Sequence, residues 1–373
     1  MTKSTTRIVL AHSGGLDTSI AIPWLAERHD AEVVAVTLDL GQDSELTEIR
    51  EAALAAGAVR AHVIDACGEF VERYALVALQ AGALYEGCDP LSAALGRAIV
   101  AARLVDVAGM EGATAIAYGP GLDASVRALD PSLTVIVPTT LWELSHADKL
   151  AYARARNVHV VTAAEGSAAA SANVWGRYAG SFAPGTAAAQ DIGYVLTRTA
   201  LDCPDEPAYL DIEFEAGVPI RANAIEMTLL EMMESLEIIA GAHGVGRIER
   251  LESGAGDTLS RVVFEAPAAV VLHTAHRALE RLVIPADLDR VKRGLARIYA
   301  DLVHEGRWSS LTREAIDAFV RTTQPRVTGS VRLKLFKGEC RVLESRSPHA
   351  LDHDSSRSTV ANQFEPAAEG FTS

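Results

Sequence analysis

Short apolar segments alternate with longer helix-like segments through the first part of the chain. The apolar segments are rich in β-branched residues, which is typical of buried strands. We predict strands at residues 7–10, 33–38, 61–64, 113–117 and 133–137, and helices at about 18–28, 44–56, 67–79 and 91–107. Strands and helices that alternate in this way form a doubly wound parallel sheet, which binds ligands beyond the carboxyl ends of its strands. This part is therefore predicted to be an α/β domain.

The pattern changes at residues 162–189, where alanine, serine and glycine dominate, and we expect a connecting loop region there. Beyond it the pattern predicts a smaller α+β domain, with a strand at 209–214, a turn through Gly217 and Pro219, helices at about 224–240, 266–282 and 287–305, and paired strands at 327–335 and 340–343. From about residue 352 the chain is polar and has no period, so we expect a surface tail. The predicted organisation is a first domain at 1–165, a second at 166–351 and a tail at 352–373.

Composition narrows the class of protein. The chain has 373 residues, of which 49% are hydrophobic, and this is ample for two domain cores. A formal net charge of −15 argues against nucleic acid or an acidic membrane as a partner, because the electrostatic term would be repulsive. No apolar run approaches a membrane span and no export signal is evident, so a cytoplasmic location is expected. Neither a zinc site nor a disulfide framework is indicated by the well-separated cysteines, Cys67, Cys88, Cys203 and Cys340.

A glycine pair at residues 14 and 15 marks the first candidate site, at the junction of a predicted strand and a predicted helix. Glycines allow a sharp turn with inward amides, the helix start adds free N–H groups, and the neighbouring hydroxyls are further donors. We therefore predict a polyphosphate cradle formed by Ala11, His12, Ser13, Gly14, Gly15, Leu16, Asp17, Thr18 and Ser19. The loop lacks the third glycine of the Rossmann fingerprint and the Gly-Lys-Thr/Ser ending of Walker A. The alternative is a glycine turn with ordinary helix caps.

The order Ser-Gly-Gly-x-Asp-Thr-Ser resembles the PP-loop of the N-type ATP pyrophosphatases, which cut ATP between the α and β phosphates. The resemblance implies an adenine nucleotide alpha-hydrolase-like fold for the first domain and ATP as a ligand. Asp17 is expected either to carry Mg²⁺ or to cap the helix.

Further segments, taken together and in order, resemble the argininosuccinate synthase family over nearly the whole chain. They are residues 83–87, 173–177, 243–248, 265–268, 273–276, 326–329 and 331–335. The resemblance implies a ligase that activates the ureido oxygen of citrulline with ATP, releases pyrophosphate, and then couples the adenylate to the amine of aspartate with release of AMP. It also implies a homotetramer.

The same resemblance carries individual roles to this chain. The ATP contacts would be residues 11–19, Leu38 and Gly119. Arg97, within Leu-Gly-Arg-Ala, matches the arginine of the family's Leu-Ala-Arg-Pro segment, and a phosphate or adenylate role is as plausible as a surface helix arginine. The predicted catalytic group is Ser13, Asp17 and Arg97, acting mostly by positioning and charge neutralisation.

The expected aspartate loop departs from the family pattern. Thr-Gly-Lys-Gly-Asn-Asp-Gln-Val-Arg is replaced by a shorter stretch at residues 120–127, which follows Tyr118 and Gly119. Arg127 matches the family's substrate arginine, and Asp123 stands near the position of the lost asparagine.

The expected citrulline pocket departs as well. Asp89 stands at a family tyrosine, Ala94 at a small hydroxyl residue, Tyr178 at a serine and Phe264 at a tyrosine, whereas Glu252 matches the family glutamate. Each unpaired buried polar group costs roughly 1 to 3 kcal/mol, so these changes oppose tight citrulline binding. Asp89 either faces the pocket, where it would suit an amine-bearing substrate, or is a solvent-facing turn residue before a proline.

We therefore expect an AMP-forming ligase of this type that uses a different acceptor, a different amine, or both, in a specialised biosynthetic pathway. Two alternatives remain open. One is argininosuccinate synthase itself, acting on citrulline and aspartate. The other is a catalytically silent nucleotide-binding paralogue, although an intact phosphate loop argues against it.

Overall fold

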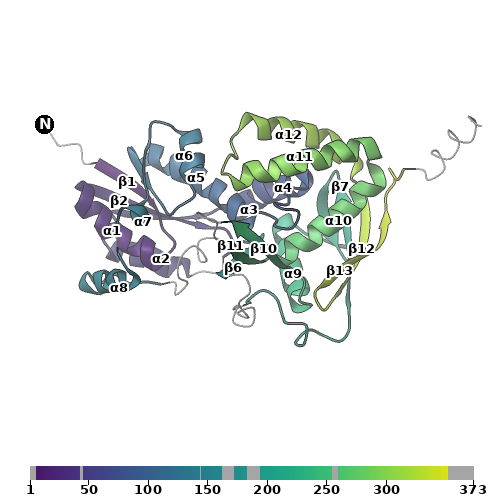
Figure 1. Cartoon of the computed structure of the whole chain (residues 1–373), viewed down its shortest axis with the longest axis horizontal. Helices are drawn as coiled ribbons and strands as arrows, with labels where there is room; N and C mark the ends of the chain where they lie inside the picture. The colour runs from purple at the N-terminus through teal and green to yellow at the C-terminus, as the bar shows by residue number, and fades with distance from the viewer. Residues whose placement is uncertain are drawn as a thin grey trace, which may run out of the picture.

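Two lobes lie side by side along the long axis of the molecule, with a small sheet between them (Figure 1). The computed structural model describes residues 6–42, 45–142, 144–161, 172–182, 194–253 and 259–351. The predicted boundary between residues 165 and 166 and the predicted tail at 352–373 lie outside these ranges and stay predictions.

The first lobe is built on a parallel sheet with strand order β3-β2-β1-β4-β5. The strands are β1 (Thr6–Ala11), β2 (Ala31–Asp39), β3 (Arg60–Asp65), β4 (Ala115–Ala117) and β5 (Thr134–Ile136). The chain reverses its direction of progress across the sheet between β1 and β4, and this switch point opens a crevice at the carboxyl ends of the strands. The predicted doubly wound α/β fold is confirmed.

Helices cover both faces of this sheet because β1 is apolar on both. Val9 joins the core that contains Ile99, whereas Leu10 joins the core that contains Ile20. The helices of the lobe are α1 (Leu16–His29), α2 (Leu46–Ala55), α5 (Ser92–Glu111), α6 (Asp123–Leu129), α7 (Pro138–Leu141) and α8 (His146–Ala155).

The helical segment predicted at 67–79 belongs to both lobes. It consists of α3 (Cys67–Phe70), a π-helical turn (Val71–Ala75) and α4 (Leu76–Ala81), and α4 packs against three helices of the second lobe. There the buried Lys292 donates to the carbonyl oxygen of Gln80 at 2.6 Å and pairs with Glu280 at 2.8 Å. Around these polar contacts, apolar side chains of the two lobes form one continuous core.

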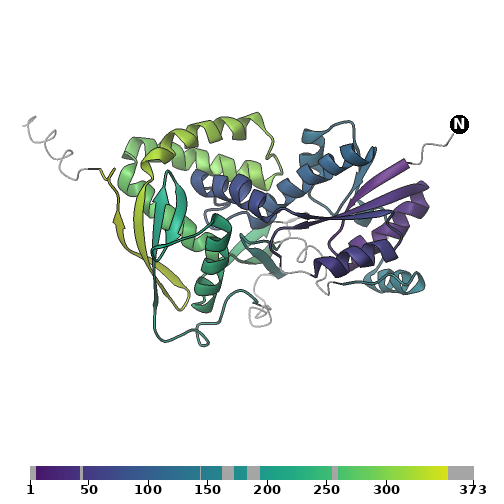
Figure 2. The same ribbon diagram turned by 180° about the vertical axis from the view of Figure 1, so that it is seen from behind.

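The second lobe has an antiparallel sheet with strand order β13-β12-β7-β8-β9. The two large sheets stand at opposite ends of the molecule, which is also clear from behind (Figure 2). The strands are β7 (Ala208–Glu215), β8 (Val218–Ala222), β9 (Ile225–Glu226), β12 (Gly329–Phe336) and β13 (Glu339–Arg346), and the helices are α9 (Leu229–Ala242), α10 (Pro267–Val283), α11 (Ala286–His304) and α12 (Leu311–Thr323). The predicted second α+β domain is thus present.

The sheet between the lobes has strand order β10-β11-β6, with β10 at Arg247–Ser253, β11 at Leu259–Glu265 and β6 at Arg177–Phe182. Our prediction that residues 162–189 form only a connecting loop is wrong for β6. Its glycine- and alanine-containing sequence carries a weak strand signal, and the segment is extended because it pairs with β11. We did not predict β10, β11 or α12.

The helix predicted at 224–240 begins later than expected, at Leu229. Thr228 caps it, because its hydroxyl accepts from the Glu231 amide while the Glu231 carboxylate accepts from the Thr228 amide. The predicted turn is also shorter, since Pro219 lies inside β8. None of the helices in the described ranges has the length and apolarity that crossing a membrane requires.

Candidate functional site

A cavity of about 1480 Å³ lies at the carboxyl ends of β1, β2 and β4 and extends to the central sheet. It is lined by residues from both lobes, including the loop after β1, the start of α5, the strands β10 and β11, and the end of α11. Of the predicted site residues, it brings together Ala11, His12, Ser13, Gly15, Leu16, Asp17, Thr18, Leu38, Ala94, Asp89, Arg97, Gly119, Tyr178, Glu252 and Phe264.

The loop after β1 is anchored to the neighbouring strand by its backbone. The His12 amide donates to the carbonyl oxygen of Val36 at 2.8 Å, and the Thr37 hydroxyl donates to the carbonyl oxygen of His12 at 2.9 Å. Gly14 has a φ of +76°, and a Cβ atom there would lie 2.8 Å from Cγ1 of Ile49. Glycine is therefore required at this turn for both conformation and space.

The start of α1 leaves its amides available to a ligand. Its N-cap is Gly15, which has no side-chain capping hydrogen bond. The first amides of a helix have no intrahelical acceptor, so those of Leu16 and Asp17 need an outside partner. Thr18 Oγ1 accepts from the Ser13 amide at 3.3 Å and lies 3.2 Å from Ser13 Oγ, which gathers two hydroxyls at the same place. The alternative of a side-chain-capped turn does not describe this helix start.

Asp17 faces a cation that we did not predict. Its Oδ1 lies 2.7 Å from Nζ of Lys149, which is on α8 and also lines the cavity. Helix α8 is held by a capping box between Ser145 and Asp148. A single lysine on a helix carries no sequence signal of this role, because only the fold brings α8 to the start of α1.

His12 is a buried, neutral group. It is 4% exposed, and burial lowers its pKa to about 4. Its Nε2 lies 3.4 Å from Oγ of Ser19, and its Nδ1 has no hydrogen-bond partner among the described residues. Ser19 and Gly14, which were also predicted to contact ATP, do not line the cavity.

The other end of the cavity is formed by side chains from several elements. Asp89 is 4% exposed, so the alternative of a solvent-facing turn residue is wrong. Its Oδ1 accepts from the Leu91 amide at 2.7 Å, and its Oδ2 lies 3.4 Å from Nε of Arg250 on β10. Burial raises the pKa of Asp89.

Arg97 lies one turn after Ala94 on α5, and both line the cavity. Burial lowers the pKa of Arg97, while the charges of Asp89 and Glu252 raise it. A Cβ atom on Gly121 would lie 3.4 Å from Cδ of Arg97, so the short stretch after β4 passes close to this side chain. The alternative of an ordinary surface arginine is therefore wrong for Arg97.

The central sheet supplies aromatic walls. Tyr178 on β6 and Phe264 on β11 meet edge to face with ring centroids 5.7 Å apart. Burial raises the pKa of Tyr178. Glu252 follows Arg250 on the same face of β10 and lies 3.6 Å from it.

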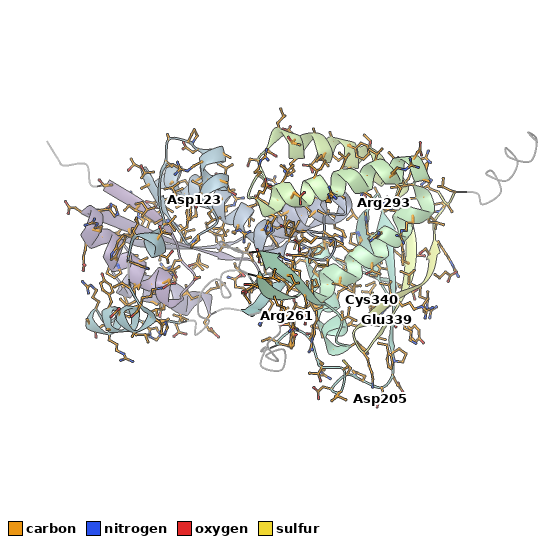
Figure 3. All side chains as sticks on the ribbon, viewed as in Figure 1. Asp123, Asp205, Arg261, Arg293, Glu339 and Cys340 are labelled. Atoms are coloured by element: carbon orange, nitrogen blue, oxygen red, sulfur yellow. The ribbon has the colours of Figure 1, made fainter. Side chains whose placement is uncertain are left out.

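The two residues carried over from the expected aspartate loop lie elsewhere. Asp123 begins α6 in the first lobe (Figure 3), and Arg127 is exposed on the same helix. Neither lines the cavity.

Sequence reasoning missed Arg250 and His304 in this cavity. Arg250 had a weak signal, because Ile248, Arg250 and Glu252 occupy alternate positions and therefore share a strand face. His304 had none. It ends α11 and stacks on Tyr85 with ring centroids 3.8 Å apart, a contact between residues distant in sequence.

Comparison with known proteins gives matches along the whole chain. The family models described as the argininosuccinate synthase N-terminal HUP domain and the argininosuccinate synthase C-terminal domain match residues 7–159 and 171–373. Argininosuccinate synthase of Symbiobacterium thermophilum is 41% identical over 98% of this chain and 94% of that one. Argininosuccinate synthases of Bacillus thuringiensis and Bacillus cereus are each 39% identical with the same coverage.

Proposed function

The chain belongs to the argininosuccinate synthase family of AMP-forming carbon–nitrogen ligases, and we propose that it adenylates an acceptor oxygen within the cavity and then couples it to an amine. The observation that carries this proposal is the helix start at residues 15–18. Its uncapped amides and paired hydroxyls suit the phosphates of ATP.

We propose separate roles for the residues that line the cavity. The loop would hold the β and γ phosphates, and Lys149 would add a positive charge beside them. Arg97 lines the same cavity near Asp89 and Glu252, and its guanidinium would neutralise charge that develops on the α phosphate. Catalysis would consist of orienting the acceptor oxygen and stabilising the departing pyrophosphate.

Citrulline and aspartate are the first substrates to test. The three relatives described above carry the name argininosuccinate synthase, and these names favour that enzyme over our expectation of other substrates.

A second assignment, with another acceptor or amine, is favoured by one specific observation. The buried pair of Asp89 and Arg250 lines the part of the cavity where we propose that the acceptor binds, here called the acceptor end, and a ligand there must satisfy two charges. Asp123 and Arg127 also lie outside the cavity lining.

One assay separates these readings. The protein is incubated with ATP, citrulline and aspartate, and pyrophosphate, AMP and argininosuccinate are measured. Turnover to argininosuccinate supports the first assignment. Pyrophosphate release only with other ureido compounds, carboxylates or amines supports the second. ATP binding without pyrophosphate release for any compound would identify a silent paralogue and refute the proposed reaction.

We also propose Mg²⁺ as the ion bound with ATP, and a homotetramer as the assembly. Asp17 fits the ion, since Mg²⁺ is usually held by one or two carboxylates together with substrate phosphates. Mg²⁺ would neutralise phosphate charge. Sedimentation equilibrium tests the assembly.

A further inference from the structure

Arg250 occupies a position where a strand residue is normally apolar. On β10, Ile248, Arg250 and Glu252 face the cavity side, whereas Glu249 and Leu251 are exposed on the other face. Only 6% of the Arg250 side chain is exposed. A guanidinium buried to this degree is costly unless its N–H groups find acceptors.

The described residues do not supply those acceptors at short distance. The nearest carboxylate oxygens, from Asp89 and Glu252, lie 3.4 Å and 3.6 Å from Arg250 nitrogens. Nε of Arg250 has no hydrogen-bond partner within the described part of the chain. One oxygen of Asp89 is already held by the Leu91 amide, which limits how that carboxylate can turn.

Aromatic rings hold the guanidinium in place. Its carbon lies 5.1 Å from the ring centroid of Tyr85 and 5.4 Å from that of Phe264, and the ring of His304 stacks on Tyr85. Contacts of this kind favour the cation without occupying its N–H donors. Arg250 is therefore held in position beside two carboxylates, while its Nε donor has no hydrogen-bond partner in the described part of the chain, and a ligand could complete this arrangement.

We propose that Arg250 is a specificity-determining residue that binds a carboxylate of the acceptor substrate, with Asp89 holding the guanidinium in position. The inference deepens the proposed function and rests on it. A guanidinium recognises a carboxylate through two parallel N–H donors, which lysine cannot reproduce. The substrate class is thus an acceptor that carries a carboxylate as well as the oxygen to be adenylated.

Binding can test this separately from turnover. Isothermal titration calorimetry is carried out on the full chain saturated with α,β-methylene-ATP, which prevents cleavage between the α and β phosphates. Two pairs of probes differ only in a carboxylate: citrulline with 4-aminobutylurea, and 4-ureidobutanoate with propylurea. We expect the carboxylate member of at least one pair to bind about 10- to 100-fold more tightly.

Variants then assign the preference to Arg250. Arg250→Met is expected to weaken binding of the probe with the carboxylate and to leave its counterpart unchanged, so that the two affinities become equal. Arg250→Lys is expected to keep part of the difference in affinity. The double variant, Asp89→Asn with Arg250→Met, removes both charges of the buried pair. It replaces Arg250→Met in the titrations if that single variant does not fold. Arg261→Met is the matched control, since Arg261 lies on the adjacent strand β11 (Figure 3) and pairs with the exposed Glu249.

The outcomes are distinguishable. If neither carboxylate probe binds better than its counterpart, or if Arg250→Met keeps the difference in affinity, the proposal for Arg250 is wrong. Loss of pyrophosphate release with every substrate, while the difference in affinity persists, would instead refute the proposed reaction and leave the carboxylate site standing.

Discussion

The two ends of the cavity are lined by different kinds of chemical group. At the proposed phosphate end, one continuous loop with free backbone amides and hydroxyls lines the cavity, and Gly15 leaves the start of α1 uncapped. At the proposed acceptor end, Asp89 and Arg250 come from separate elements of the fold, and Arg97, proposed to act on the α phosphate, comes from a third. A backbone cradle depends on chain conformation and is insensitive to most side chains, whereas a side-chain cluster can be changed one residue at a time. We therefore expect the phosphate end to determine the type of reaction and the acceptor end to determine which substrate is used.

The largest effect is expected at the phosphate end, from Asp17→Asn. The substitution removes the carboxylate that pairs with Lys149 and that would hold Mg²⁺. We expect pyrophosphate release to fall about 10²- to 10³-fold at saturating ATP, with little loss of stability. Glu27→Gln, which alters an exposed carboxylate near the end of the same helix, should leave the rate unchanged. An unchanged rate in Asp17→Asn would remove this side chain from the reaction.

The acceptor end should respond to Asp89→Asn with a loss of stability. Arg250 would remain buried without its nearest carboxylate, which costs about 3 kcal/mol in the free energy of unfolding. Urea denaturation of the variant and the unaltered protein measures this change in the free energy of unfolding. Asp205→Asn is the control, because Asp205 and its partner Lys337 form an exposed ion pair, and such pairs contribute little to stability. If Asp89→Asn and Asp205→Asn lost the same free energy of unfolding, the buried ion pair would not differ in stability from the exposed one.

A pH experiment compares a buried with an exposed imidazole. The folded-state pKa of His12 is lowered to about 4, below its unfolded value, so folding opposes protonation. Its contribution is fully present above about pH 6.5 and is lost as the pH falls toward 4. We expect the drop in unfolding free energy between pH 7 and pH 5 to be about 2 kcal/mol smaller in His12→Asn than in the unaltered protein. His159→Asn, which changes an exposed histidine, should keep the original drop.

The smallest effect is expected from Lys149→Met. Loss of one partly exposed cation beside the phosphates should raise the KM for ATP about tenfold and change kcat less. Steady-state kinetics at varied ATP measure both constants. Arg154→Met, on the exposed side of α8, is the control. A fall in kcat at constant KM would place Lys149 in transition-state stabilisation instead.

The same contrast explains what could be predicted from the amino-acid sequence. The parallel sheet and the loop at residues 11–19 are local patterns, and both were found. Asp89 was recognised as unusual, but its partner was not, because β10 follows it by more than a hundred residues and its strand signal is interrupted by Arg250. Lys149 and His304 were missed for the same reason, since only tertiary packing brings them to the cavity. Strand β6 was missed because its pairing with β11 outweighs its weak propensity.

The shared core has a consequence for how the chain is made. Leu79 on α4 is fully buried, and α4 packs against α10, α11 and α12, which are synthesised much later. During synthesis, the apolar surface of α4 therefore stays exposed until the last third of the chain has been translated. The segment that joins the lobes cannot be fully packed before the second lobe is made, so a chain that stops early is expected to aggregate.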